Sequence, residues 1–228
     1  DVERSRGLGD VYKRQIQGFK EVFEPLGGTV VEEIYTPFGV TDFAPYFVKI
    51  DPDKIDAVYV FFFGGDAISF VKQWSEYGLK ELVPVIGIGI TDGALLLAEG
   101  DAALGLETVA NYSSEYDTPV NKAFVKAYEE KYNMDVDFHA DLGYVTAKLY
   151  LIGLEAVKGN TDDVDGMIAA IEKADFEAPR GRFHYGPNHA PIQPVKLRKV
   201  IKVDGKLRNG VVEVYDEIGQ GWLPPELK

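Results

Sequence analysis

The feature that most constrains the fold is a series of short apolar segments separated by glycine turns and helical stretches. The first, Asp56–Phe62 (DAVYVFF), is apolar almost without interruption, and Pro84–Gly89 (PVIGIG) and Leu104–Ala110 follow it. Short segments without polar alternation are typical of strands buried on both faces of a parallel sheet. We therefore expect an α/β fold in which a parallel sheet is flanked by helices.

The segments between these strands show helical spacing of apolar residues. We expect helices at Asp66–Tyr77 and Thr91–Glu99, with Thr91 or Asp92 as the N-cap of the second helix. Short strand–helix–strand connections predict right-handed crossovers. Upstream of them, the sequence predicts a helix at Ile16–Leu26, a strand at Thr29–Tyr35 (TVVEEIY) and a short helix at Phe43–Ile50.

After Ala110 the character of the chain changes. A long helix is expected at His139–Lys158, and it is apolar on nearly every side except for a narrow stripe of Asp141, Lys148 and Glu155. Such a helix requires packing partners around most of its surface. The other expected elements are helices at Asn121–Tyr132 and Val164–Ala174, a short strand within residues 178–194, and a hairpin of Val195–Val203 with Gly210–Tyr215.

Composition excludes several classes of function. The net charge of −13 and the lack of a basic stripe argue against nucleic acid as a partner. The chain has no cysteine, which excludes disulfides, thiolate catalysis and cysteine-ligated zinc. His139, His184 and His189 lack acidic residues at a spacing typical of metal ligands, so structural or surface roles are favoured over a metal or acid–base site. We expect neither a metal nor a cofactor.

Five stretches of the chain carry a resemblance to known proteins. They are QIQGFKEVFEPLGGTVV, DAVYVFFFGGDAISFVKQWSEYGL, GDAALGLETVANYSSEYDTPVNKAFVKAYEEKY, GYVTAKLYLIGLEAV and PRGRFHYGPNHAPIQPV. None is diagnostic alone, but in order and spacing they resemble type I periplasmic binding proteins of the leucine/isoleucine/valine-binding class. The similarity runs from Ile16 to Val212. It implies two α/β lobes, joined by a three-stranded hinge, that close on a ligand.

The resemblance also implies a division of the chain into lobes. Residues 16–116 and 194–228 are expected to form the second lobe, and residues 117–193 to be helices and a short strand of an incomplete first lobe. Residues 1–15 lack apolar periodicity and are expected to be foreign sequence or a disordered basic arm. Members of the family are longer, so we expect this chain to be an N-terminally truncated fragment.

Candidate ligand-binding residues lie where the buried strands end. In open parallel sheets, ligands bind beyond the carboxyl ends of the strands. Glycines let a ligand approach the backbone closely, and free N–H groups at a helix start favour a carboxylate. The candidates are Phe63, Gly64, Gly65 and Asp66 after one strand, Gly89, Ile90, Thr91 and Asp92 after the next, and Tyr35 on the same rim.

These candidates have a structural alternative. The two turns are also consistent with simple strand-to-helix connections, with Asp66 as an N-cap. Tyr35 and its neighbours Phe38 and Phe47 are also consistent with core packing.

The resemblance suggests how a ligand would be held. It implies that an aromatic residue near Phe63 packs on the ligand, and that leucine-type members hold the ligand ammonium with an acidic residue near Gly89. Here the local sequence is GIG, without an acid, although Asp92 is a candidate substitute. An aromatic or aliphatic carboxylate is therefore at least as well supported as an amino acid.

A second set of candidates lies where the chain is expected to cross between lobes. Tyr112, Ser113, Ser114 and Tyr116 are candidate hinge residues that would absorb lobe rotation. The alternative is an ordinary polar loop.

The expected function is the extracytoplasmic substrate-binding component of an ABC importer. It would bind a small amino acid or organic acid and deliver it to the membrane permease, without catalysis. We expect a periplasmic or extracellular location, with lipid anchoring left open. The alternatives are a ligand-sensing domain of a receptor or regulator, or an α/β enzyme that uses Asp66 and Asp92 as acid–base groups.

Overall fold

The computed structural model describes residues 8–227 of the 228-residue chain. Two compact units can be distinguished. Unit 1 comprises the chain up to Thr108 together with the C-terminal residues from Leu223, and unit 2 comprises Val109–Trp222. The lobe assignment implied by the resemblance stays a prediction.

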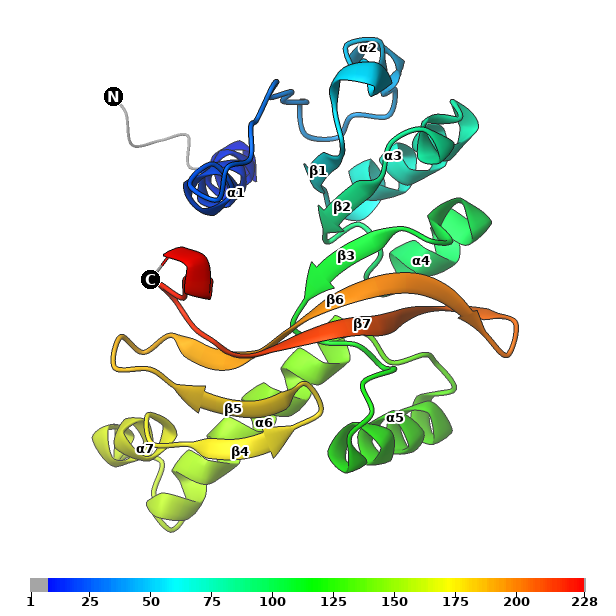
Figure 1. The fold of residues 1–228 in the computed structure, drawn as a ribbon. Coiled ribbons are helices and arrows are strands. Elements are labelled where there is room, and N and C mark those ends of the chain that lie inside the picture. The colour runs from blue at the N-terminus through cyan, green and yellow to red at the C-terminus, as the bar shows by residue number, and fades with distance from the viewer. Residues whose placement is uncertain (1–7, 228) are drawn as a thin grey trace. The chain divides into compact units, whose positions relative to one another are not determined.

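Unit 1 alternates helices and strands in the expected order. Its strands β1, β2 and β3 are parallel, with Val58 opposite Val85, Phe61 opposite Ile88 and Ile86 opposite Glu107. Figure 1 shows α3 and α4 on one side of these strands and α1 on the other. The elements are α1 (Leu8–Phe23), α2 (Ala44–Phe47), β1 (Val58–Phe61), α3 (Gly64–Glu76), β2 (Val85–Ile88), α4 (Ala94–Glu99) and β3 (Glu107–Ala110).

An aromatic cluster between α2 and α3 forms much of the core of unit 1. Phe43, Phe47, Phe70 and Trp74 are all buried. Phe47 meets Phe70 and Trp74 edge-on, with ring centroids 5.8 and 5.4 Å apart. Edge-to-face pairs of this kind add to the stabilisation that comes from burial alone. The short helix α2 is therefore fixed by its side chains. Phe47 packs in the core and does not line a pocket.

The predicted strand at Thr29–Tyr35 is wrong. These residues are extended but belong to no strand. Glu33, at the centre of the segment, pairs with Lys20 of α1 at 2.5 Å instead of contributing to a β-ladder. The preceding helix is confirmed and begins earlier than expected, at Leu8, and its Phe19 stacks on Tyr59 of β1 at 4.3 Å.

Unit 2 consists of three helices and four antiparallel strands. Strand β4 pairs with β5, β5 with β6, and β6 with β7. The predicted hairpin is confirmed, and its strands are longer than expected, with Asp204 and Gly205 at its turn. The elements are α5 (Pro119–Tyr132), α6 (Phe138–Ala156), α7 (Val164–Ile171), β4 (Asp175–Ala178), β5 (Gly181–Tyr185), β6 (Pro191–Val203) and β7 (Lys206–Ile218).

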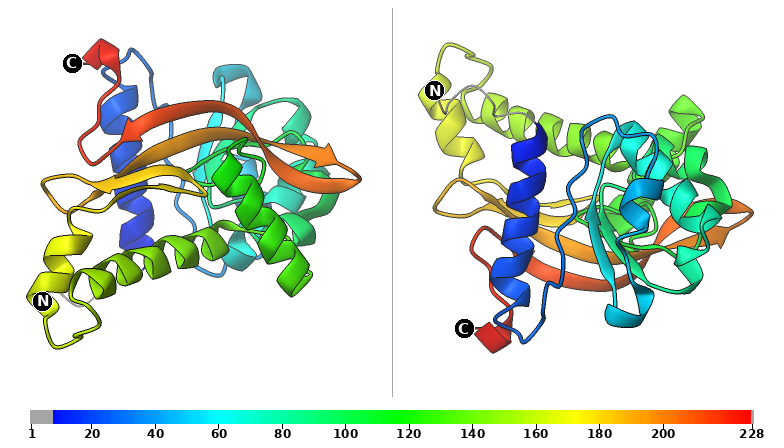
Figure 2. Two further views of the ribbon diagram at one scale, coloured as in Figure 1. Left: turned by 90° about the horizontal axis from the view of Figure 1, so that it is seen from below. Right: turned by 90° about the horizontal axis from the view of Figure 1, so that it is seen from above.

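The long helix α6 is only partly covered. Figure 2 shows α6 running along the β4–β5 pair. Val145 of α6 forms a small core with Ala178 and Phe183, and Leu149 packs against it. Much of the remaining surface of α6 is apolar and open, because Leu142, Tyr144, Tyr150 and Leu151 are exposed. This open apolar surface agrees with the expectation that the helix needs further packing partners.

The incomplete covering of α6 can be tested with two matched substitutions. Leu151→Ala on the open side should change the free energy of unfolding by less than about 0.5 kcal/mol. Leu149→Ala on the packed side should lower it by about 2 kcal/mol, because it leaves a cavity. Urea denaturation followed by circular dichroism measures both. Equal losses for the two variants would show that the outer face of α6 is covered.

Candidate functional site

The carboxyl ends of β1 and β2 bring the two predicted turns together. Because Phe61 lies opposite Ile88, the residues that follow each strand leave the sheet at the same edge. Gly89 has φ of 76°, and a Cβ at this position would overlap the Phe63 ring and the Phe62 carbonyl oxygen. Position 89 therefore requires glycine, for its backbone conformation and for this close approach.

Phe63 places an aromatic ring at this edge. Its side chain is 44% exposed, and the ring meets Phe61 edge-on at 4.9 Å. Phe63 is also the N-cap of α3, and it makes no side-chain capping bond. Gly64 and Gly65 follow it, and a Cβ at either would meet no other atom. An exposed ring thus lies beside a helix start whose backbone is accessible to a small anion.

Asp66 has a structural role in this site. Its side chain is 4% exposed, and its carboxylate accepts a hydrogen bond from the Gly39 N–H at 3.1 Å. It lies inside the first turn of α3 and is not the N-cap, so that alternative is wrong. Gln73 supports the same loop by accepting from the Phe43 N–H at 2.8 Å and donating to the Thr41 carbonyl oxygen. Asp66 therefore fixes the loop that precedes β1.

The second turn is more buried than the first. Ile90 and Thr91 are fully buried, and the Thr91 hydroxyl donates to Thr108 Oγ1 at 3.3 Å. The N-cap of α4 is Gly93, with φ of 57°, so the prediction of Thr91 or Asp92 at this position is wrong. Thr91 is engaged with β3, and Asp92 is half-buried at the start of the turn into α4.

The Tyr35 hydroxyl is fixed by a hydrogen bond. The hydroxyl donates to Glu33 at 2.6 Å, and this bond raises the pKa of Tyr35 to about 12. Its ring is 43% exposed, and Phe38 nearby is more exposed still. Tyr35 is thus a fixed, partly exposed aromatic side chain. Its role in ligand binding stays a prediction, as do the roles of the residues in the two turns.

The comparison with known proteins assigns the family. The family described as "Periplasmic binding protein" matches residues 11–206. The chain belongs to this family. A curated relative, the Leu/Ile/Val-binding protein homolog 6 of Brucella melitensis, is 28% identical over 90% of this chain and 54% of its own length. The chain therefore spans about half the length of the curated relatives that it matches.

Two solved structures of ABC transporter solute-binding proteins are also similar. One, from Rhodopseudomonas palustris BisB5 in complex with 3,4-dihydroxybenzoic acid, is 37% identical with a TM-score of 0.82. The other, from R. palustris in complex with 4-hydroxybenzoate, is 31% identical with a TM-score of 0.83. Each match covers 90% of this chain and 57% of the other. The relatives are solute-binding proteins, and the expected type I α/β fold is confirmed.

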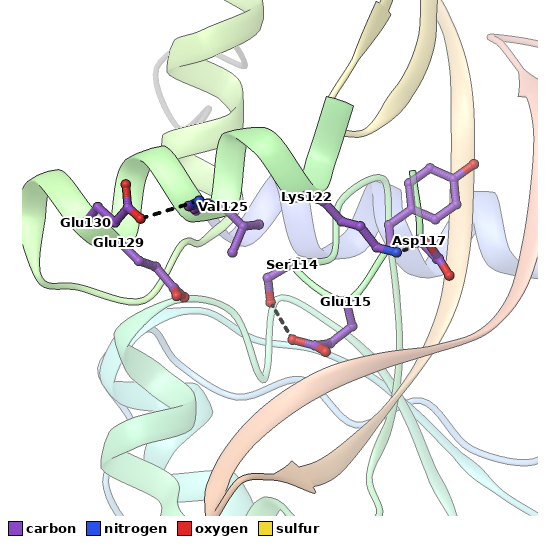
Figure 3. A pocket seen from close by; sticks show the side chains of 9 residues that line it. Ser114, Glu115, Asp117, Lys122, Val125, Glu129 and Glu130 are labelled. Atoms are coloured by element: carbon purple, nitrogen blue, oxygen red, sulfur yellow. Dashed lines mark hydrogen bonds and ion pairs between the residues drawn. The ribbon is translucent and has the colours of Figure 1, made fainter. Parts of the chain in front are cut away.

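The predicted hinge residues Ser114 and Tyr116 border a polar cavity within unit 2. Figure 3 shows this cavity, of about 500 Å³, between residues 114–117 and α5. Lys122 pairs with Asp117 at 2.6 Å and Lys126 with Glu130 at 3.9 Å, all with exposed side chains. Exposed ion pairs contribute little to stability and hold no fixed geometry. The cavity is therefore a solvated groove rather than an organised ligand site.

The three histidines lie apart from one another, each beside a carboxylate. His139 is 3.4 Å from Asp137, His184 is 2.8 Å from Glu217, and His189 is 3.0 Å from Glu172. Within residues 8–227, no three acidic or histidine side chains gather in a way that could hold a metal ion. In the same range, no helix is both long and apolar enough to cross a bilayer.

Sequence reasoning missed one buried carboxyl group in unit 1. Glu99, at the end of α4, is 3% exposed, and neither of its carboxyl oxygens has a hydrogen-bond partner among the described residues. Burial, together with a smaller effect of the nearby charge of Asp92, raises the pKa of Glu99 to about 8. No local signal marks this residue, since a glutamate in a helix is usually exposed.

This raised pKa predicts how the stability of unit 1 depends on pH. The folded state holds a proton on Glu99 that the unfolded state releases above its ordinary pKa of 4.5. The Glu99 contribution to the free energy of unfolding is therefore fully present below about pH 4.5 and is lost as the pH rises towards 8. The slope is about 1.4 kcal/mol per pH unit.

Glu99→Gln should remove this slope and stabilise the protein at pH 7.5, because the amide carries no charge to bury. Glu81→Gln, at an exposed position in the same unit, is the control and should leave the profile unchanged. Urea midpoints between pH 5 and 8.5 measure the effect. An unchanged profile in the Glu99→Gln variant would contradict the assignment.

Proposed function

We propose that the complete protein is the substrate-binding component of an ABC importer and binds a small aromatic carboxylate. The observation that carries the proposal is the edge of unit 1, where the exposed Phe63 ring lies beside Gly89 and the uncapped start of α3. The apolar Phe63 ring is suited to the aromatic ring of such a ligand, and the accessible backbone N–H groups are suited to its carboxylate. Because this chain spans only part of its relatives, we assign it one wall of the binding cleft.

The aromatic half of the ligand would pack on Phe63. Ring pairs contribute about 0.5–1.5 kcal/mol beyond the area that they bury. The carboxylate would lie at the N-terminus of α3, where an anion is favoured by about 0.3–1 kcal/mol at an exposed site. The solved relatives in complex with 4-hydroxybenzoate and 3,4-dihydroxybenzoic acid support this class of ligand.

An amino acid is the less favoured ligand. Its ammonium group requires a carboxylate at the site, and the turn that follows β2 begins with glycine. Asp66, in the other turn, has its carboxylate engaged by the Gly39 N–H. The same engagement disfavours Asp66 as an acid–base group of an enzyme. The curated relative named as a Leu/Ile/Val-binding homologue supports the family rather than this choice of ligand.

Transport follows from binding without any covalent step. A ligand that contacts both lobes binds the closed form better than the open form, and so shifts the population towards closure. The closed form would then deliver the solute to the permease. The family assignment supports a location outside the cytoplasm, in the periplasm or at the cell surface.

The ligand class can be tested by NMR titration of the 15N-labelled chain. With one wall of the cleft present, we expect 4-hydroxybenzoate to bind weakly, with a Kd on the order of 1 mM, or about −4 kcal/mol. Amide signals of residues 63–66 and of Gly89 should shift, and leucine should leave them in place. Phe63→Ala should weaken binding of 4-hydroxybenzoate about tenfold, because the stacking partner is lost.

Tyr132→Ala is the matched control, since Tyr132 is an exposed aromatic residue on α5 in the other unit. It should leave the affinity unchanged. Larger shifts with leucine than with 4-hydroxybenzoate would reverse the choice of ligand. An absence of shifts at residues 63–66 and 89 with both compounds would refute the site.

A further inference from the structure

The crossing segment, residues 111–116, is held by side chains at its carbonyl oxygens. Nδ2 of Asn121, a fully buried residue in the first turn of α5, lies 3.1, 3.1 and 2.9 Å from the carbonyl oxygens of Ser113, Ser114 and Tyr116. Asn121 itself is fixed because its backbone N–H donates to the capping hydroxyl of Thr118. The two N–H hydrogens of a single amide group are thus shared among three carbonyl oxygens within four residues.

Two buried cations of β6 bind the rest of the segment. Lys196 Nζ donates to the Asn111 carbonyl oxygen at 2.9 Å and to the Arg180 carbonyl oxygen at 2.6 Å. Arg198 donates to the Tyr112 carbonyl oxygen at 2.8 Å. Lys196 and Arg198 are both almost completely inaccessible to solvent. Buried donors of this kind must be bonded, so each carbonyl group that they meet is fixed in place.

The surroundings of Lys196 explain why its partners are carbonyl groups. Its Nζ also lies 4.3 Å from the centre of the Tyr116 ring, on the crossing segment itself. Asp141 is buried nearby, but its carboxylate pairs with Arg180 at 2.6 Å. Burial lowers the pKa of Lys196 to about 8, against the opposing charge of Asp141. The ammonium group is therefore held by backbone dipoles and an aromatic face.

We infer that Asn121, Lys196 and Arg198 form a clamp that holds residues 111–116 in one backbone conformation. Any backbone rotation within the segment would have to break these hydrogen bonds. Ser113 strengthens the same arrangement, since its hydroxyl donates to the Asn209 carbonyl oxygen of β7 and accepts from the Glu115 N–H. Closure itself rests on the proposed function, whereas the clamp does not.

Amide hydrogen exchange of the ligand-free chain, followed by NMR, tests the clamp. The amides of Glu115, Tyr116 and Thr118 report on it, because each donates to an oxygen atom of the segment. In the wild-type chain, we expect them to exchange as slowly as the paired amides of β6 and β7. Lys196→Met and Asn121→Leu should each accelerate exchange of these three amides tenfold or more and leave α6 unchanged.

Lys148→Met, at an exposed position on α6, is the control and should have no effect on the three amides. The clamp is refuted if the wild-type amides exchange as fast as those of the hairpin turn at Asp204 and Gly205, or if both clamp variants leave them unchanged. Should a variant fail to fold, the wild-type rates alone decide. The measurement uses no ligand, so its outcome is independent of the ligand titration.

Discussion

The in-register parallel pairing of β1 and β2 is the constraint on which the candidate site depends. Because the two strands run side by side in the same direction, the turns that follow them must leave the sheet at one edge. Their approach is so close that position 89 tolerates only glycine beside the Phe63 ring. Neither turn alone would form a ligand-binding surface. Together they place the Phe63 ring beside Gly89 and the start of α3, and this is the surface that we propose for the ligand.

The two units achieve rigidity by different means. Unit 1 relies on aromatic packing around Phe47 and Trp74, which is favourable wherever water is excluded. Unit 2 buries charges, with Arg180 and Asp141 paired in its interior and Lys196 on carbonyl groups. Buried ion pairs add little net stability but strongly disfavour arrangements in which one partner is left unpaired. We infer that the polar interior of unit 2 favours one geometry for residues 111–116.

The elements that sequence alone predicted are those with a strong local pattern. β1, β2 and the helices α3 and α6 have dense apolar runs or clear periodicity, and all four were located correctly. The segment at Thr29–Tyr35 has strand-forming residues, but a strand also needs a neighbour, and that depends on distant parts of the chain. The prediction of the α4 N-cap was wrong for a similar reason, because the Thr91 side chain forms a hydrogen bond with Thr108 of β3.

The same limit applies to the functional residues. The glycine turns could be found from sequence, since they follow buried strands. The clamp could not, because Lys196 and Asn121 are distant in sequence and ordinary in type. Asp141 was identified only as part of a polar stripe, and its buried partner Arg180 lies far along the chain.

Intermolecular NOEs test most directly the central claim that the paired ends of β1 and β2 form the ligand surface. Isotope-filtered spectra of the labelled chain with unlabelled 4-hydroxybenzoate would detect ligand ring protons close to the protein. We expect NOEs from these protons to the Phe63 ring and to the Gly89 α-protons. NOEs confined to the groove beside α5, with none at Phe63 or Gly89, would contradict the account.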